Sequence, residues 1–171
     1  MPMNPMEKAL AVFFRVTMGW VFLYAAYQQI SDPNWAAATF LDETRTAHDF
    51  FVWFASPTKV AATNFLVKWG HLSIGLSLVF GFLTRLSAFK GAILMFVYYL
   101  AHMDFPYVEN QSNFLVDYHL IYLGVLVQLM ISGAGHIVGL DRWVSRSHIL
   151  HEHPFLRWLV GIQFSPGAGS R

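Results

Sequence analysis

Long apolar runs dominate this chain and restrict how it can fold. About 20 residues of α-helix, rising ~1.5 Å each, cross the hydrocarbon core of a bilayer. The runs of about that length are residues 9–30, 60–84, 86–103 and 114–135. Because only a very short turn separates the second run from the third, we expect those two helices to be antiparallel neighbours. The sequence therefore predicts an all-α integral membrane protein, folded as a four-transmembrane-helix up-and-down bundle.

Charged residues are too scarce to give the chain a polar surface. They make up 12% of the 171 residues, whereas soluble domains carry about 25%, so we predict a lipid bilayer around the chain. The net charge of +1 gives no reason to expect a nucleic-acid partner. The chain has no cysteine and no dinucleotide-binding glycine fingerprint. We therefore predict no haem, flavin or iron–sulfur cluster.

The segments between and after the runs have a different composition. Residues 31–59 carry acids and several aromatic side chains, so we expect one or two short interfacial helices there. This segment is also where a small second subunit would contact the chain. Residues 104–113 are interpreted as a small acidic loop, with Asn113 as the N-cap of the last helix. After the fourth run, a basic segment with interleaved Trp and Leu predicts another interfacial helix. Residues 1–160 are thus expected to form a single domain, which is compatible with a homo-oligomer. Residues 161–171 are expected to be a disordered tail.

Loop cations predict how the bundle is oriented. Cytoplasmic loops are enriched in Lys and Arg, and five cations of this chain flank the turn between the second and third runs or follow the fourth run. With four spans, both places lie on one side of the membrane. Both termini are therefore predicted to be cytoplasmic, and residues 31–59 and 104–113 to face outward. The cations concerned are Arg85, Lys90, Arg142, Arg146 and Arg157.

Histidines gather near the outer boundary on this topology. His71 lies near the start of the second helix, His102 closes the third and His119 opens the fourth. Such a cluster can bind a metal, pass protons or hydrogen-bond a quinone head group, or lie at a wet boundary without any chemistry. Asp117 and His119 would point about 200° apart on a helix, and this poor spacing argues against a metal. The residues assigned to the site are His119, Asp117, His71 and His102 as catalytic candidates, with Tyr98 and Tyr122 beside them.

Other polar residues in the runs have structural interpretations. Arg15 either pairs with Asp141 or extends to the membrane surface. Gln28 and Gln29 are expected only to cap the outer end of the first helix. Gln128 is expected to form a hydrogen bond between helices.

Several short motifs occur in a fixed order along the chain. The first run contains R-x-x-x-G-W-x-F, which begins at Arg15, and the second contains G-x-x-x-x-x-G-x-x-x-R, which ends at Arg85. The fourth contains F-L-V-D-Y-H-L-I-Y, followed by G-A-G-x-x-x-G-L-D-R-W. In order and spacing these motifs resemble the DoxX/DoxD membrane family, specifically chains labelled as the large subunit of thiosulfate:quinone oxidoreductase. The resemblance covers roughly residues 10–158.

This resemblance implies a four-helix protein of the prokaryotic plasma membrane. It also implies oxidation of thiosulfate to tetrathionate with reduction of a membrane quinone, beside a second, smaller subunit. The family's acid-x-His at the head of the last span corresponds to Asp117 and His119. Relatives often close the first span with Lys or Arg, but this chain has Gln28 and Gln29, so Lys68 becomes the candidate cation. The alternatives are a non-enzymatic anchor or assembly subunit of a redox complex, and a protein that handles small solutes or lipids.

Overall fold

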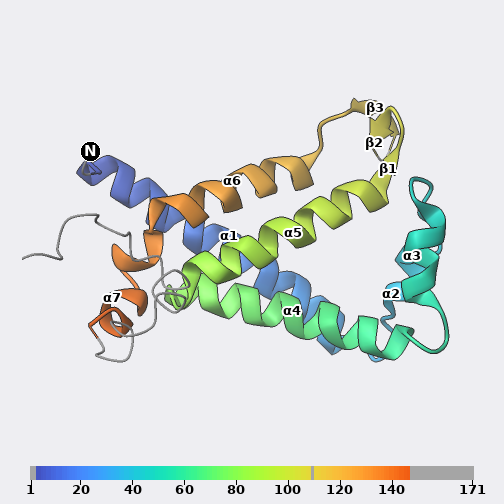
Figure 1. Ribbon diagram of the computed structural model, residues 1–171, viewed down its shortest axis with the longest axis horizontal. Helices are drawn as coiled ribbons and strands as arrows, with labels where there is room; N and C mark the ends of the chain where they lie inside the picture. Colours follow the sequence, from blue (N-terminus) through green and yellow to red (C-terminus); the bar gives the residue numbers. More distant parts are fainter. Residues whose placement is uncertain (1–2, 109, 147–171) are drawn as a thin grey trace, which may run out of the picture.

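Four long helices run along the molecule in the computed structural model, which describes residues 3–108 and 110–146 (Figure 1). They are α1 (Pro5–Ser31), α4 (Val60–Phe80), α5 (Thr84–His102) and α6 (Tyr118–Ser132). The shorter elements are α2 (Ala37–Leu41), α3 (His48–Ala55), β1 (Met103–Asp104), β2 (Tyr107–Val108), β3 (Asn110–Phe114), the 3₁₀ helix η1 (Ala134–His136) and α7 (Asp141–Val144). The predicted helical class is confirmed, with one small sheet added. The predicted tail at 161–171, most of the C-terminal interfacial segment and Arg157 lie outside the described residues.

Helix α1 has the length and hydropathy needed to cross a bilayer. Within the described residues it is the one helix both long and apolar enough to cross a membrane, whereas α6 is apolar but shorter. Its start is fixed by a capping box, in which Asn4 Oδ1 accepts a hydrogen bond from Glu7 N at 2.9 Å and Asn4 N donates to Glu7 Oε2 at 2.8 Å. The number of membrane crossings, expected to be four, stays a prediction.

The long helices pack most extensively as two pairs, α1 with α4 and α5 with α6. Glycines bring α1 and α4 together. A Cβ at Gly75 would lie 2.8 Å from Leu23 N, and one at Gly19 would lie 2.9 Å from Val79 N, so neither position has room for a side chain. The predicted neighbours α4 and α5 also contact each other across their short turn. The core between the pairs includes Met18, Phe22, Ile74, Leu78, Met95, Leu126 and Leu129.

One end of the bundle carries α2, α3 and the sheet, and we call it the hairpin end (Figure 1). Residues 31–59 contain two short helices, where one or two were expected, and their position at a membrane interface stays a prediction. They pack on the end of α5 through a second apolar cluster formed by Ala37, Leu41, Phe51 and Ala101. The plain loop expected at 104–113 is wrong, because most of this segment pairs as an antiparallel sheet in the order β1-β2-β3, with Asp104 opposite Tyr107.

Helix α6 begins later than predicted. Asn113, the expected N-cap, lies in β3. The N-cap is Asp117, whose Oδ1 accepts a hydrogen bond from Leu120 N at 3.2 Å. The expected span 114–135 is therefore wrong at its start, because pairing of β3 with β2 uses backbone groups that a helix would need. The shift places Asp117 and His119 together at the first turn of α6.

The opposite end carries the start of α1, the α4–α5 turn and α7. A buried arginine and a buried aspartate hold these segments together through hydrogen bonds to the backbone. Arg15 is 2% exposed, and its Nη1 donates to Ala134 O at 2.8 Å. The carboxylate of Asp141 accepts from Leu83 N at 2.6 Å and from Thr84 N at 3.0 Å. Burial raises the pKa of the Asp141 carboxyl, and these hydrogen bonds oppose the rise. Extension of Arg15 to the membrane surface is therefore wrong, because its guanidinium binds backbone carbonyls inside the bundle.

Candidate functional site

A cavity of about 470 Å³ lies at the hairpin end, among α1, α4, α5 and α6 and beside the α2–α3 segment. Its wall is mainly apolar and aromatic, which suits a hydrophobic ligand. We call this space the aromatic cavity. The wall residues that matter below are Gln29, Trp35, Phe40, Phe54, Tyr98, His102, Tyr118 and His119.

Three of the predicted site residues line this cavity together. The ring centroids of His102 and His119 are 4.7 Å apart, and those of Tyr98 and His119 are 5.9 Å apart. His71 lies behind Tyr98 rather than at the cavity surface, and the centroids of these two rings are 5.7 Å apart. The fold thus brings two of the three histidines into direct contact and connects the third through Tyr98. Among the described residues, no group of three His, Cys, Asp or Glu side chains is arranged to hold a metal ion.

Backbone hydrogen bonds determine which nitrogen carries hydrogen in two of these histidines. His71 Nδ1 lies 2.8 Å from Val67 O, and His102 Nδ1 lies 2.9 Å from Tyr98 O, each four residues earlier on the same helix. A carbonyl oxygen can only accept, so Nδ1 is the donor in both rings. In the neutral ring Nε2 then carries the lone pair. Nε2 is therefore the atom with which these rings can accept a proton or a ligand's hydrogen bond.

The carboxylate of Asp117 orients His119. The distance from His119 Nδ1 to Asp117 Oδ2 is 2.6 Å, and both residues are buried. Within a regular helix the two side chains would point about 200° apart, but Asp117 is an N-cap with extended backbone (φ −127°, ψ −177°). Its side chain can therefore turn back over the first turn of α6. A carboxylate that holds the Nδ1–H of an imidazole stabilises the protonated ring, which suits proton transfer at Nε2.

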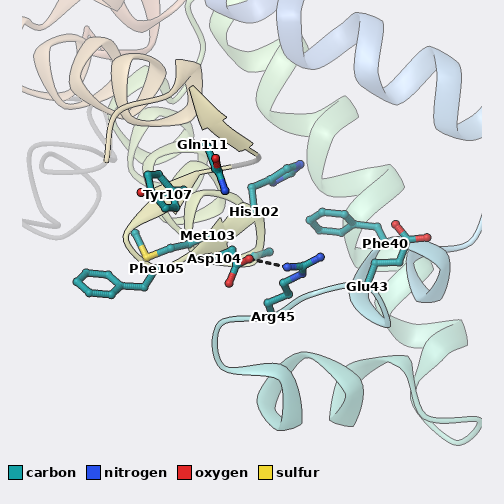
Figure 2. A pocket seen from close by; sticks show the side chains of 10 residues that line it. Phe40, Glu43, Arg45, His102, Met103, Asp104, Phe105, Tyr107 and Gln111 are labelled. Carbon is teal, nitrogen blue, oxygen red and sulfur yellow. Dashed lines mark hydrogen bonds and ion pairs between the residues drawn. The ribbon is translucent and has the colours of Figure 1, made fainter. Parts of the chain in front are cut away.

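A second pocket, of about 750 Å³, lies between the α2–α3 connection and the sheet (Figure 2). We call it the outer pocket. Phe40 and His102 line both this pocket and the aromatic cavity. Arg45 reaches across from the connection, and its Nη1 donates to Asp104 Oδ2 on β1 at 2.6 Å. His102 therefore stands between an apolar cavity and a more polar, charged one.

Two other predicted residues contact the wall from outside it. The rings of Tyr122 and Tyr118 are 5.7 Å apart, centroid to centroid. Lys68 Nζ lies 5.1 Å from the ring centroid of Trp35. The sequence suggested that Tyr122 and Lys68 bind the ligand themselves, but the fold gives them contacts to wall residues. Their direct role in binding stays a prediction.

The sequence reasoning missed Gln29, which is 9% exposed and lines the aromatic cavity. Its neighbour Gln28 is exposed, and its Nε2 donates to the Tyr24 hydroxyl at 2.8 Å. Helical periodicity separates the two, because the buried face of α1 repeats every three or four residues and Gln29 continues it. That face comprises Ala11, Arg15, Met18, Gly19, Phe22, Ala26 and Gln29. Gln128, in contrast, is exposed on α6, so the hydrogen bond between helices expected there is wrong.

A comparison with protein-family models matches the DoxX model over residues 10–103. The match spans α1 to α5, including His71 and His102, and ends before Asp117 and His119. Searches of curated proteins and of solved structures each found no match. The matched segment is more than half of the chain, and α1 has the length and hydropathy of a membrane-crossing helix. The chain therefore belongs to the DoxX family of membrane proteins.

Proposed function

We propose that this DoxX protein binds a membrane quinone in the aromatic cavity and reduces it, as the quinone-reducing subunit of a thiosulfate:quinone oxidoreductase. The observation that carries the proposal is the meeting of Tyr98, His102 and His119 at one wall of a mainly apolar cavity. A quinone combines an apolar ring and tail with oxygens that need hydrogen-bond partners. The wall offers surface for the ring and hydrogen-bonding groups for the oxygens.

Proton supply is the chemistry that this site supports best. Reduction of a quinone to a quinol consumes two electrons and two protons, and oxidation of two thiosulfate ions to one tetrathionate releases two electrons, so the half-reactions balance. His119, held by Asp117, is the proposed donor of a proton to one quinone oxygen. His102, which borders the outer pocket, is the proposed path by which protons arrive from water. The electrons come from thiosulfate, directly or through a smaller subunit that contacts residues 31–59.

The proposal includes a place in the cell. We place the chain in a prokaryotic plasma membrane with four crossings, as the family resemblance implies, and the loop cations favour both termini in the cytoplasm. The hairpin end then faces outward, and the outer pocket lies on the side from which a water-soluble electron donor arrives. Quinone enters the aromatic cavity from the lipid, where both its oxidised and reduced forms dissolve.

Thiosulfate-dependent quinone reduction by the full chain in lipid, with and without a co-expressed smaller subunit, tests this function. We expect His119→Ala to lower the rate about 10²- to 10⁴-fold, the range for loss of a general acid or base. Gln128→Ala is the control. Gln128 lies on the same helix as His119, but it is exposed and does not line the cavity. Its loss should leave the rate unchanged. Absence of both turnover and quinone binding overturns the proposal.

A second candidate function is the handling of lipids or small apolar solutes. The mainly apolar wall, to which α2, α3 and α4 contribute, favours it. An acyl chain needs no proton donor, so His119→Ala would leave the amount of bound lipid unchanged. Mass spectrometry of molecules released from the purified protein separates the candidates, because the first predicts quinone and the second predicts lipid without quinone.

A further inference from the structure

Gln29 places an amide in the wall of the aromatic cavity. The residue is 9% exposed, and its Oε1 has no hydrogen-bond partner among the residues that the structure describes. Most buried polar atoms in proteins do have a partner, because leaving one unpaired is costly. The Oε1 atom itself is buried, but the residue lines the cavity, so a turn of the side chain toward the cavity would let a ligand there complete the hydrogen bonding of the amide.

Packing alone does not account for an amide at this position. Gln29 follows Phe22 and Ala26 on the buried face of α1, where those two residues are 1% and 0% exposed. An apolar side chain at the end of this face would pack without an unpaired polar atom. Gln28, one residue earlier, faces outward and already has the Tyr24 hydroxyl as a partner. The two adjacent glutamines thus differ in their surroundings, and only the buried one lines the cavity.

Gln29 and the histidines belong to different helix pairs. Gln29 is on α1, which packs mainly with α4, whereas His102 and His119 are on α5 and α6, which pack mainly with each other. All three residues line the same cavity. A ligand in the cavity therefore meets hydrogen-bonding groups contributed by both helix pairs.

We propose that Gln29 is the second polar contact of the ligand, and that it selects rings bearing two oxygens, one bound by Gln29 and one by His102 or His119. This inference rests on the quinone-binding function proposed above. The Gln29 amide offers both a donor and an acceptor. Nε2–H can donate to a quinone carbonyl, and Oε1 can accept from a quinol hydroxyl. By turning about its last side-chain bond, the same residue can hold the oxidised and the reduced ring.

Two variants and two small ligands test this selection. Gln29→Met keeps an unbranched side chain of similar length and removes the amide, and Gln28→Met makes the same change at the exposed position. The ligands are 1,4-naphthoquinone, which has two carbonyl oxygens, and 1-tetralone, which has the same bicyclic carbon skeleton and one carbonyl oxygen. Calorimetry on the full chain in lipid nanodiscs measures their dissociation constants. Thermal unfolding of each ligand-free variant is measured in parallel.

We expect Gln29→Met to weaken 1,4-naphthoquinone binding about tenfold, a common result of losing one hydrogen bond. The preference for 1,4-naphthoquinone over 1-tetralone should shrink by a similar factor. Gln28→Met should change neither value. The unfolding temperature of Gln29→Met should not fall, because the amide oxygen has no protein partner to lose among the described residues.

Two results overturn the inference while leaving quinone binding intact. One is an undiminished preference for 1,4-naphthoquinone in Gln29→Met. The other is a lower unfolding temperature with unchanged binding, which would make Gln29 a structural residue. A wild-type protein that binds no 1,4-naphthoquinone contradicts the proposed function itself, so the two failures are distinguishable.

Discussion

His119 Nδ1 lies 2.6 Å from Asp117 Oδ2, and the other oxygen of the same carboxylate caps α6 by accepting from Leu120 N at 3.2 Å. One side chain therefore starts the helix and orients the imidazole that we propose as the proton donor. The two roles differ in what they require, because a cap needs one acceptor oxygen whereas the imidazole needs the second oxygen and its charge. Substitutions at Asp117 can separate them.

Asp117→Asn should impair catalysis with little loss of stability. Asn caps helices about as well as Asp, so we expect the free energy of unfolding to change by less than about 1 kcal/mol. With its oxygen capping α6, the amide turns an N–H toward His119 Nδ1 and disfavours the required tautomer. Quinone reduction in nanodiscs should then fall about 10²-fold. Equal rates for Asp117→Asn and the wild type would contradict the role assigned to this pair.

Gly75→Ala should loosen the contact between α1 and α4. The new Cβ would lie 2.8 Å from the backbone nitrogen of Leu23, so the helices must move apart. We expect a loss of about 1–3 kcal/mol, typical of overpacking, in equilibrium unfolding in detergent. Gly70→Ala is the matched control on the same helix, because its Cβ meets nothing within 4 Å. The idea of a close glycine contact fails if the two variants are equally stable.

Arg15→Met should weaken the end of the bundle that carries α7. The change removes the donor to Ala134 O and a cation whose charge interacts with the buried Asp141. We expect a loss of about 2–4 kcal/mol in unfolding free energy, because a buried charge loses its compensation. Arg142→Met, at an exposed position in α7, should change it by less than about 0.5 kcal/mol. A similar small change for Arg15→Met would show that the buried guanidinium is dispensable.

The ion pair of Arg45 and Asp104 should contribute little to stability. Their side chains are 75% and 55% exposed, so water and salt weaken the attraction. A double-mutant cycle with Arg45→Gln and Asp104→Asn should give a coupling energy below about 1 kcal/mol, and it should shrink further in high salt. A larger, salt-independent coupling would mean that the pair is shielded, for example by a partner on the outer pocket.

Helix positions followed closely from the sequence where one helix could be interpreted alone. The expected spans 9–30, 60–84 and 86–103 each overlap one long helix, because long apolar runs act locally. Helix α1 nevertheless begins earlier than expected, at Pro5, because the Asn4 capping box starts it there. The predicted start of the last helix was wrong, since the apolar residues around Phe114 fit a strand as well as a helix. Only pairing with β2 decides between them.

The sequence by itself determined the helical class, the membrane family and the gathering of histidines near one end of the bundle, because these depend on composition, run length and order along the chain. Tertiary structure decided which side chains share the aromatic cavity. That choice depends on how each helix is rotated against its neighbours, and packing between distant segments sets the rotation. For the same reason Gln29 faces the cavity while Gln28 faces outward, and an N-cap carboxylate reaches an imidazole that regular helix geometry would place on another face.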